Sequence, residues 1–149
     1  MKKSFLLALL MSTLIPISAS ASDYMPESEL IIHAVAASHP DADLGAKTAI
    51  CAVILNRVEA GGFGDTAAAV IRAHDSGLDP TLLCEPIGEK NYRITRDAYL
   101  AASSGADPTG GMLYFEKLPE PSRRDNRVEF SEEMDLDKYS AVISGYGFY

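Results

Sequence analysis

The residues best suited to chemistry stand together near the end of the first predicted helix, as Ser38, His39 and Asp41. A hydroxyl, an imidazole and a carboxylate are the groups of a serine hydrolase relay. Neighbouring residues at a helix end point apart, however, and the sequence has no Gly-x-Ser-x-Gly nucleophile elbow. A serine hydrolase is therefore disfavoured, and the simplest interpretation of Ser38 is a hydroxyl that packs against the core and hydrogen-bonds to a backbone carbonyl.

The histidines of the chain are His33, His39 and His74, and they lack the spacing of a metal site. His33 and His39 are separated by six positions, which places them on different faces of a helix. We therefore expect no metal and no cofactor.

The elements that must position these groups are predicted to be helices first and strands later. A helix is expected over residues 26–38, because acidic residues follow Pro26 and because Pro40 disfavours helix at His39. A second helix is expected after a capping loop at 41–43 and continues to about residue 59. It is apolar nearly all round, which is typical of a central, buried helix.

The second half of the chain changes from helical to extended patterns. A short helix is expected up to residue 73 with Asp65 as its cap, then a long loop over 74–91, and a fourth helix over 94–104. Short strands are predicted at 112–115, 128–130, 139–143 and 147–149. About four helices followed by a small antiparallel sheet make an α+β fold.

The first 21 residues have the pattern of a secretory signal peptide. Two lysines precede an apolar run over residues 5–17, and Ala-Ser-Ala follows at 19–21. The run is too short to span a bilayer. We therefore predict cleavage near Ala21, one domain over residues 22–149, and a secreted or cell-envelope location.

The chain is acidic, with 21 acidic and 13 basic residues and a formal net charge of −8. This negative charge disfavours nucleic acid as a partner. It also disfavours binding to an anionic membrane after the signal peptide is cleaved. The sequence indicates no oligomeric state. In an exported chain a disulfide between Cys51 and Cys84 is permitted, but the sequence leaves open whether the two sulfurs meet.

Two separate segments are together more specific than any single residue. Residues 45–58 read GAKTAICAVILNRV and end near Asn56 and Arg57, and residues 107–115 read DPTGGMLYF. With Gly-Phe-Tyr at 147–149, they make the chain resemble the SleB/CwlJ type of cell wall hydrolase. The resemblance implies a lysozyme- or transglycosylase-like groove and peptidoglycan as partner, since such enzymes cut its glycan strand, notably in spore cortex.

The resemblance also implies one catalytic glutamate, at the end of the first helix within Ala-Glu-Ala. Counting back from Asn56 without a gap places Ser38 at that position. A serine hydroxyl cannot donate a proton to the glycosidic oxygen as a carboxylic acid does. Two further departures are Ser76-Gly77-Leu78 in place of Gly-Gln-Phe, and Tyr146 in place of a histidine before the final Phe-Tyr.

Asp41 is the best candidate for a substitute acid, because a short loop can carry it toward the groove beside His39. Asn56, Tyr114 and Tyr146 are candidate sugar-binding residues, although Asn56 fits a structural amide better. By strand alternation one of Tyr114 and its neighbour Phe115 faces inward and the other outward.

Three functions remain from the sequence. The leading hypothesis is a secreted peptidoglycan hydrolase-like protein with weakened or relocated catalysis. The alternative is a non-catalytic peptidoglycan-binding or regulatory pseudoenzyme. A third is a structural protein of the envelope or spore that uses only the fold.

Overall fold

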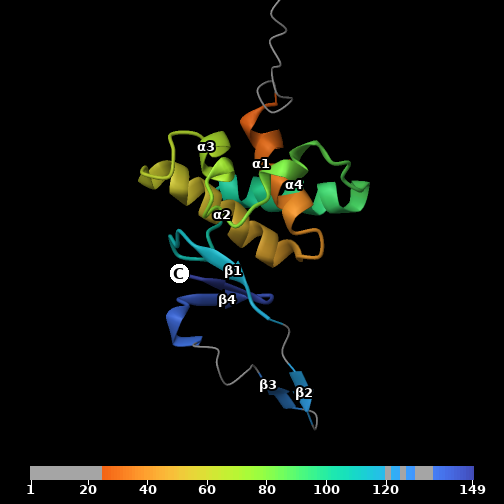
Figure 1. The fold of residues 1–149 in the computed structure, drawn as a ribbon, viewed down its shortest axis with the longest axis vertical. Coiled ribbons are helices and arrows are strands. Elements are labelled where there is room, and N and C mark those ends of the chain that lie inside the picture. The colour runs from red at the N-terminus through yellow and green to blue at the C-terminus, as the bar shows by residue number, and fades with distance from the viewer. Residues whose placement is uncertain (1–24, 120–121, 125–126, 130–135) are drawn as a thin grey trace, which may run out of the picture.

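The computed structural model describes residues 25–119, 122–124, 127–129 and 136–149, and within them helices precede strands (Figure 1). The helices are α1 (Glu27–Ser38), α2 (Leu44–Ala60), α3 (Ala67–Arg72), η2 (Pro80–Cys84), α4 (Glu89–Ser103) and η3 (Leu136–Lys138), of which η2 and η3 are 3₁₀-helices. The predicted signal peptide lies outside the described residues. No helix in the described ranges is long and apolar enough to cross a bilayer.

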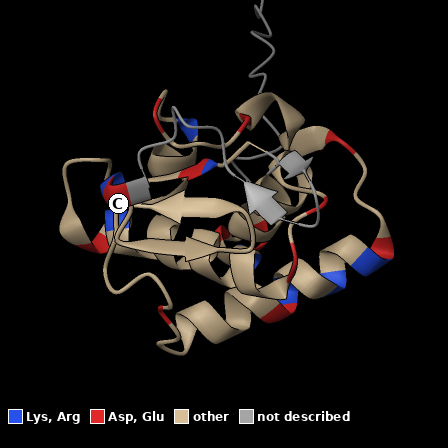
Figure 2. Cartoon of the chain, turned by 90° about the horizontal axis from the view of Figure 1, so that it is seen from below, with Lys and Arg blue, Asp and Glu red and all other residues tan. Residues whose placement is uncertain are grey.

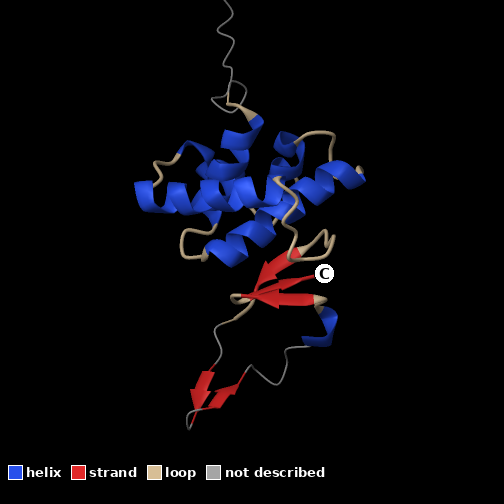
Figure 3. Ribbon diagram, turned by 180° about the vertical axis from the view of Figure 1, so that it is seen from behind, coloured by secondary structure: helices blue, strands red, loops and turns tan. Residues whose placement is uncertain are grey.

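The strands form a small antiparallel sheet with a separate hairpin. The sheet has the order β1-β5-β4, from β1 (Phe115–Lys117), β4 (Ala141–Ile143) and β5 (Tyr146–Phe148). The hairpin pairs β2 (Ser122–Arg124) with β3 (Arg127–Glu129). Figure 3 shows the helices as one layer and the three-stranded sheet as a second layer beside them. The predicted α+β fold is confirmed.

The core is built around α2, as its apolar composition predicted. Asp43 caps the start of α2 by accepting a hydrogen bond of 2.8 Å from the amide of Ala46. The helix ends at Gly61, whose φ of 70° suits glycine. Two charged side chains, Lys47 and Arg57, are nevertheless fully buried in α2. Their burial was not predicted, because each lies next to a polar residue, Thr48 or Asn56, near one end of the helix.

The fourth helix starts at Glu89 and not at residue 94, so the predicted loop is shorter than expected. Its first turn is polar and therefore shows no apolar periodicity. Those residues fold as helix because tertiary contacts hold them: the Asn91 side chain donates to the carbonyl oxygen of Ala36, and Tyr92 donates to Glu29. The start also places Glu89 at the positive end of the helix dipole.

The strands predicted at 128–130, 139–143 and 147–149 lie within two residues of β3, β4 and β5, whereas β2 was not predicted. The first strand begins at Phe115, because residues 112–114 instead follow the turn that contacts α2. Within the sheet Phe115 pairs with Phe148, and both rings are buried. An ideal Cβ on Gly147 would lie 2.4 Å from the Tyr139 ring, so only glycine fits there.

Candidate functional site

The last turn of α1 carries Ser38 to a contact with the loop before η2. The helix ends here because Pro40 forces His39 out of helical geometry, with φ −130° and ψ 62°. Ser38 is half-buried, and its Oγ accepts a hydrogen bond of 2.9 Å from the amide of Asp79. The hydroxyl therefore holds the start of η2, and its backbone partner is an amide and not the carbonyl that the sequence predicted.

His39 links this loop to the sheet. Its Nε2 lies 3.1 Å from the carbonyl oxygen of Gly77, and its Nδ1 lies 3.1 Å from the hydroxyl of Tyr146. A carbonyl only accepts, so Nε2 carries the proton, and in the neutral ring Nδ1 accepts from Tyr146. Burial lowers the pKa of His39, which favours this neutral form.

Tyr146 approaches His39 from β5, 107 positions away in sequence. Its side chain is 4% exposed, and burial together with the charges of Asp41 and Asp43 raises the pKa of its phenol. The phenol therefore stays protonated and serves as a donor. Ser38, His39, Gly77 and Tyr146, here called the His39 site, are thus brought together from three parts of the chain.

Carboxylates near the His39 site are held in the ionised form. Asp79 accepts from the Thr81 amide at 2.9 Å and from its hydroxyl at 2.6 Å, and these bonds lower the pKa of Asp79. Asp43 accepts from Ala46 and from Ser144, which lowers its pKa likewise. Neither carboxylate is prepared to give a proton to a leaving group.

Asp41 is exposed in the turn between α1 and α2. Its negative charge is among the causes that raise the pKa of Tyr146, so the carboxylate lies on the side of the His39 site. Asp41 follows His39 by two positions in the chain, at a place open to solvent. Its role as a substitute acid stays a prediction.

Asn56 joins the two motif segments to each other. Its side-chain amide donates to Asp107 at 3.1 Å and to the carbonyl oxygen of Met112 at 3.3 Å. Asp107 in turn accepts from Thr109 and from the amide of Gly111, which closes the turn at 107–111. These contacts account for Asn56 without a ligand, and its role in sugar binding stays a prediction.

Arg57 holds the same turn from the buried side. It is 1% exposed, and it donates to the backbone carbonyl oxygens of Leu113 and of Asp75, the latter at 3.0 Å. Its guanidinium also lies 5.0 Å from the ring centroids of Phe63 and Tyr114. A structural arginine was expected, but its hydrogen-bond partners are carbonyl groups and not a carboxylate.

Tyr114 is separated from the His39 site. Phe115 faces the core, and Tyr114 stacks on Tyr149 with ring centroids 5.5 Å apart. Strand alternation therefore puts Tyr114 on the opposite face from Phe115 and Phe148. Of the three predicted sugar-binding residues, only Tyr146 lies with Ser38 and His39.

A buried network beside α1 was missed by sequence reasoning. Lys47 is fully buried and donates through Nζ to the side chains of Asn91 and Thr95, the latter at 3.0 Å. Burial lowers the pKa of Lys47. The signal that could have found it is a lysine within an otherwise apolar helix, facing a polar helix start at 89–93.

Both cysteines are free thiols, Cys51 buried in α2 and Cys84 exposed at the end of η2. Burial raises the pKa of the Cys51 thiol to about 12.

In the described ranges no cluster of His, Cys, Asp or Glu is arranged to hold a metal ion. Acidic segments are spread over the helices and loops among basic ones (Figure 2).

Comparison with known proteins agrees with this architecture. Residues 42–135 match the family model described as Cell Wall Hydrolase, a range that begins after Ser38. The crystal structure of the catalytic domain of the Bacillus cereus SleB protein is similar, with a TM-score of 0.57 and 23% identity. That alignment covers 82% of this chain and 88% of the other, and at this identity it shows the fold. No curated protein matches the chain.

Proposed function

The chain belongs to the cell wall hydrolase family, and we propose that it is exported, binds the glycan strand of peptidoglycan at the His39 site, and cuts that strand slowly. Binding is proposed because residues 42–135 match the family model and the fold is similar to that of the SleB catalytic domain. Slow cutting is proposed because of one residue, Ser38. Export is proposed from the signal-peptide pattern of residues 1–21.

The observation that carries the proposal is the environment of Ser38. The family resemblance places the catalytic glutamate here, and the structure has a hydroxyl that accepts from the amide of Asp79. Loss of one positioned acid typically costs about 10²–10⁴-fold in rate. The carboxylate of Asp79 is bonded to Thr81, and its lowered pKa keeps it ionised at neutral pH. Binding is then the main remaining property of the site.

A second candidate function is glycan cleavage with a relocated acid. It is favoured by the position of Asp41, whose charge is among the causes of the raised pKa of Tyr146. A sugar bound over the His39 site would cover Asp41 and exclude water from it. Asp41 would then protonate the leaving glycosidic oxygen in the complex.

The two candidates are separated by one experiment on purified peptidoglycan sacculi. The chain without residues 1–21 is compared with Ser38→Glu, Asp41→Asn and, as matched control, Asp65→Asn at an exposed position. Turbidity follows breakdown, chromatography identifies released sugars, and co-sedimentation measures binding. The leading proposal expects wild type to sediment with sacculi and to release fragments slowly, and Ser38→Glu to release them about 10²–10⁴-fold faster.

Other outcomes are equally informative. Cleavage by wild type that disappears in Asp41→Asn, but not in Asp65→Asn, would establish the relocated acid and overturn the leading proposal. A wild-type chain that neither sediments with sacculi nor cuts them would contradict both candidates.

A further inference from the structure

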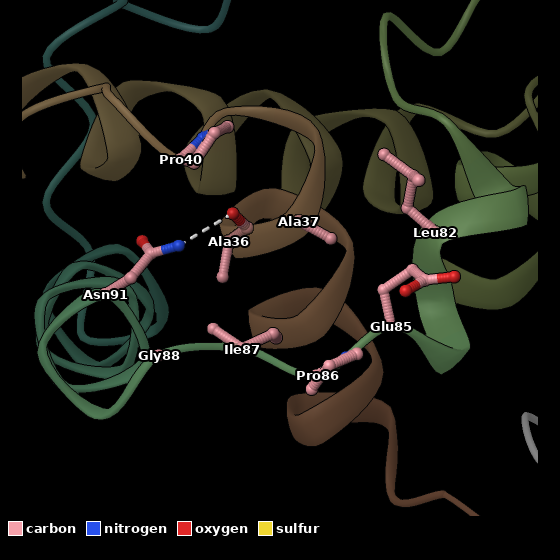
Figure 4. A pocket seen from close by; sticks show the side chains of 9 residues that line it. All are labelled: Ala36, Ala37, Pro40, Leu82, Glu85, Pro86, Ile87, Gly88 and Asn91. Carbon is pink, nitrogen blue, oxygen red and sulfur yellow. Dashed lines mark hydrogen bonds between the residues drawn. The ribbon is translucent and has the colours of Figure 1, made fainter.

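A pocket of about 220 Å³ lies against the last turn of α1. Figure 4 shows its walls: Ala36, Ala37 and Pro40 from the end of α1 and beyond, Leu82 from η2, Glu85, Pro86, Ile87 and Gly88 from the following loop, and Asn91 from α4. The volume is below the roughly 300–1,000 Å³ of sites that enclose a whole ligand. It suits one substituent of a larger ligand.

The pocket has mixed polar and apolar walls and one fixed donor. Asn91 donates through its amide nitrogen to the carbonyl oxygen of Ala36 at 2.9 Å, as the dashed line in Figure 4 marks. A carbonyl cannot donate, so the nitrogen must face Ala36 and the amide oxygen must face Lys47, which donates to it. The orientation of the Asn91 amide is therefore determined from both sides.

This orientation leaves one N–H of Asn91 for a ligand. A carboxamide has two N–H hydrogens, and Ala36 takes one of them. Lys47, fully buried, donates to the amide oxygen of Asn91, which polarises the amide and strengthens its remaining donor. A group that enters here must offer an acceptor to Asn91 and an apolar surface to Pro40, Pro86 and Ile87.

The charges around the pocket determine which kind of acceptor group a ligand can place there. Glu85 is the charged residue in its lining, and it disfavours a carboxylate. The donor of Asn91, backed by Lys47, disfavours an ammonium group at the same place. A neutral acetamide satisfies both conditions, because its carbonyl accepts from Asn91 and its methyl group contacts the apolar walls.

The pocket adjoins the His39 site through α1 and η2. Ala37 lines the pocket and its neighbour Ser38 belongs to the His39 site, so the last turn of α1 contributes to both sites. Ser38 contacts Asp79 at the start of η2, while Leu82 in η2 and Glu85 just after it line the pocket. A polysaccharide bound at the His39 site can therefore direct a ring substituent into the pocket.

We propose that this pocket is an acetamide subsite that recognises the N-acetyl group of an amino sugar in the bound glycan strand, with Asn91 as donor. The proposal rests on the proposed function, since it concerns the same bound strand. It makes the protein selective for N-acetylated over N-deacetylated glycan, whether or not the strand is cut.

The test uses glycan strands freed of stem peptides, in N-acetylated form and after chemical N-deacetylation. Binding of the chain without residues 1–21 is measured by calorimetry for wild type, Asn91→Asp, Ala37→Leu and the matched control Ala60→Leu, at an exposed position on α2. Loss of one hydrogen bond and one buried methyl contact predicts about tenfold weaker binding of the deacetylated strand to wild type.

Asn91→Asp replaces the donor with an acceptor and keeps the shape, and Ala37→Leu fills the pocket. Both should lower affinity for the acetylated strand about tenfold and remove the selectivity, while Ala60→Leu should keep both. The acidic chain attracts the cationic deacetylated strand in general, so charge alone cannot produce the expected preference.

Three results would overturn the proposal. Equal binding of both strands by wild type refutes the subsite while leaving the proposed function standing. If both Asn91→Asp and Ala37→Leu keep the preference for the acetylated strand, that preference arises outside this pocket. Failure of wild type to bind either strand refutes the subsite and the proposed function together.

Discussion

The contact between Asn56 and Asp107 predicts that the two motif segments are energetically coupled. Asp107 accepts from Thr109 at 2.9 and 2.6 Å, from Gly111 at 2.6 Å and from Asn56 at 3.1 Å. Bonds to a charged group contribute about 1.5–3 kcal/mol each, but water replaces much of this at a half-exposed carboxylate. Asp107→Ala should therefore cost about 2–3 kcal/mol of the free energy of unfolding. Asn56→Ala, which loses Asp107 and Met112, should cost about 1–2 kcal/mol.

The shared hydrogen bond is lost in either single variant. The double variant should therefore cost about 1 kcal/mol less than the sum of the two single costs. Urea unfolding at neutral pH measures all three values. Asn56→Ala combined with Asp65→Ala, at an exposed position, is the control and should be additive within about 0.5 kcal/mol. Additivity in the Asn56–Asp107 cycle itself would refute the coupling of the two segments.

Two further predictions follow from buried titratable groups. His39 has its pKa lowered below the ordinary 6.5, so the unfolded chain binds more protons between the two values. The contribution of His39 to the free energy of unfolding is thus present above pH 6.5 and is lost as the pH falls toward the folded pKa. Urea unfolding should therefore show that wild type is more stable than His39→Gln by a smaller margin at pH 5.5 than at pH 7.5. An equal margin at the two pH values would contradict this. A thiol reagent at pH 8 should label the exposed Cys84 in the native protein and Cys51 only after unfolding, because burial raises the pKa of Cys51 to about 12. Rapid labelling of both thiols, measured by mass spectrometry with Cys84→Ser as control, would show that α2 is open to solvent.

The family scaffold was predictable because its signals are local or pairwise between segments. The Asn56-Arg57 tip and the turn at 107–111 were recognised separately, and the structure shows that they bind each other. Their pairing explains why the two segments occur together. It also explains why Asn56 and Arg57 are occupied by structural contacts, since the amide and the guanidinium satisfy backbone carbonyls of the turn.

The candidate site was predictable only in part. Ser38, His39 and Asp41 were identified because they follow one another in the chain, and Tyr146 because of its place in the family pattern. Asp79, Lys47 and Asn91 were not identified. Each is a common polar residue in a loop, a helix or a helix start, and its importance comes from a partner that is distant in sequence.

The sequence by itself determined where the helices around the site begin and end. Pro40 ends α1, Asp43 caps α2 and Gly61 ends it, because sterics and capping depend on residues a few positions apart. Only the tertiary structure decided what those ends face. His39 is neutral and bonded to Tyr146 because folding buries it against a strand 107 positions away, and Asn91 is oriented because Ala36 and Lys47 meet it from two other helices. Protonation state and amide orientation depend on burial and on partners in space, which no local pattern contains.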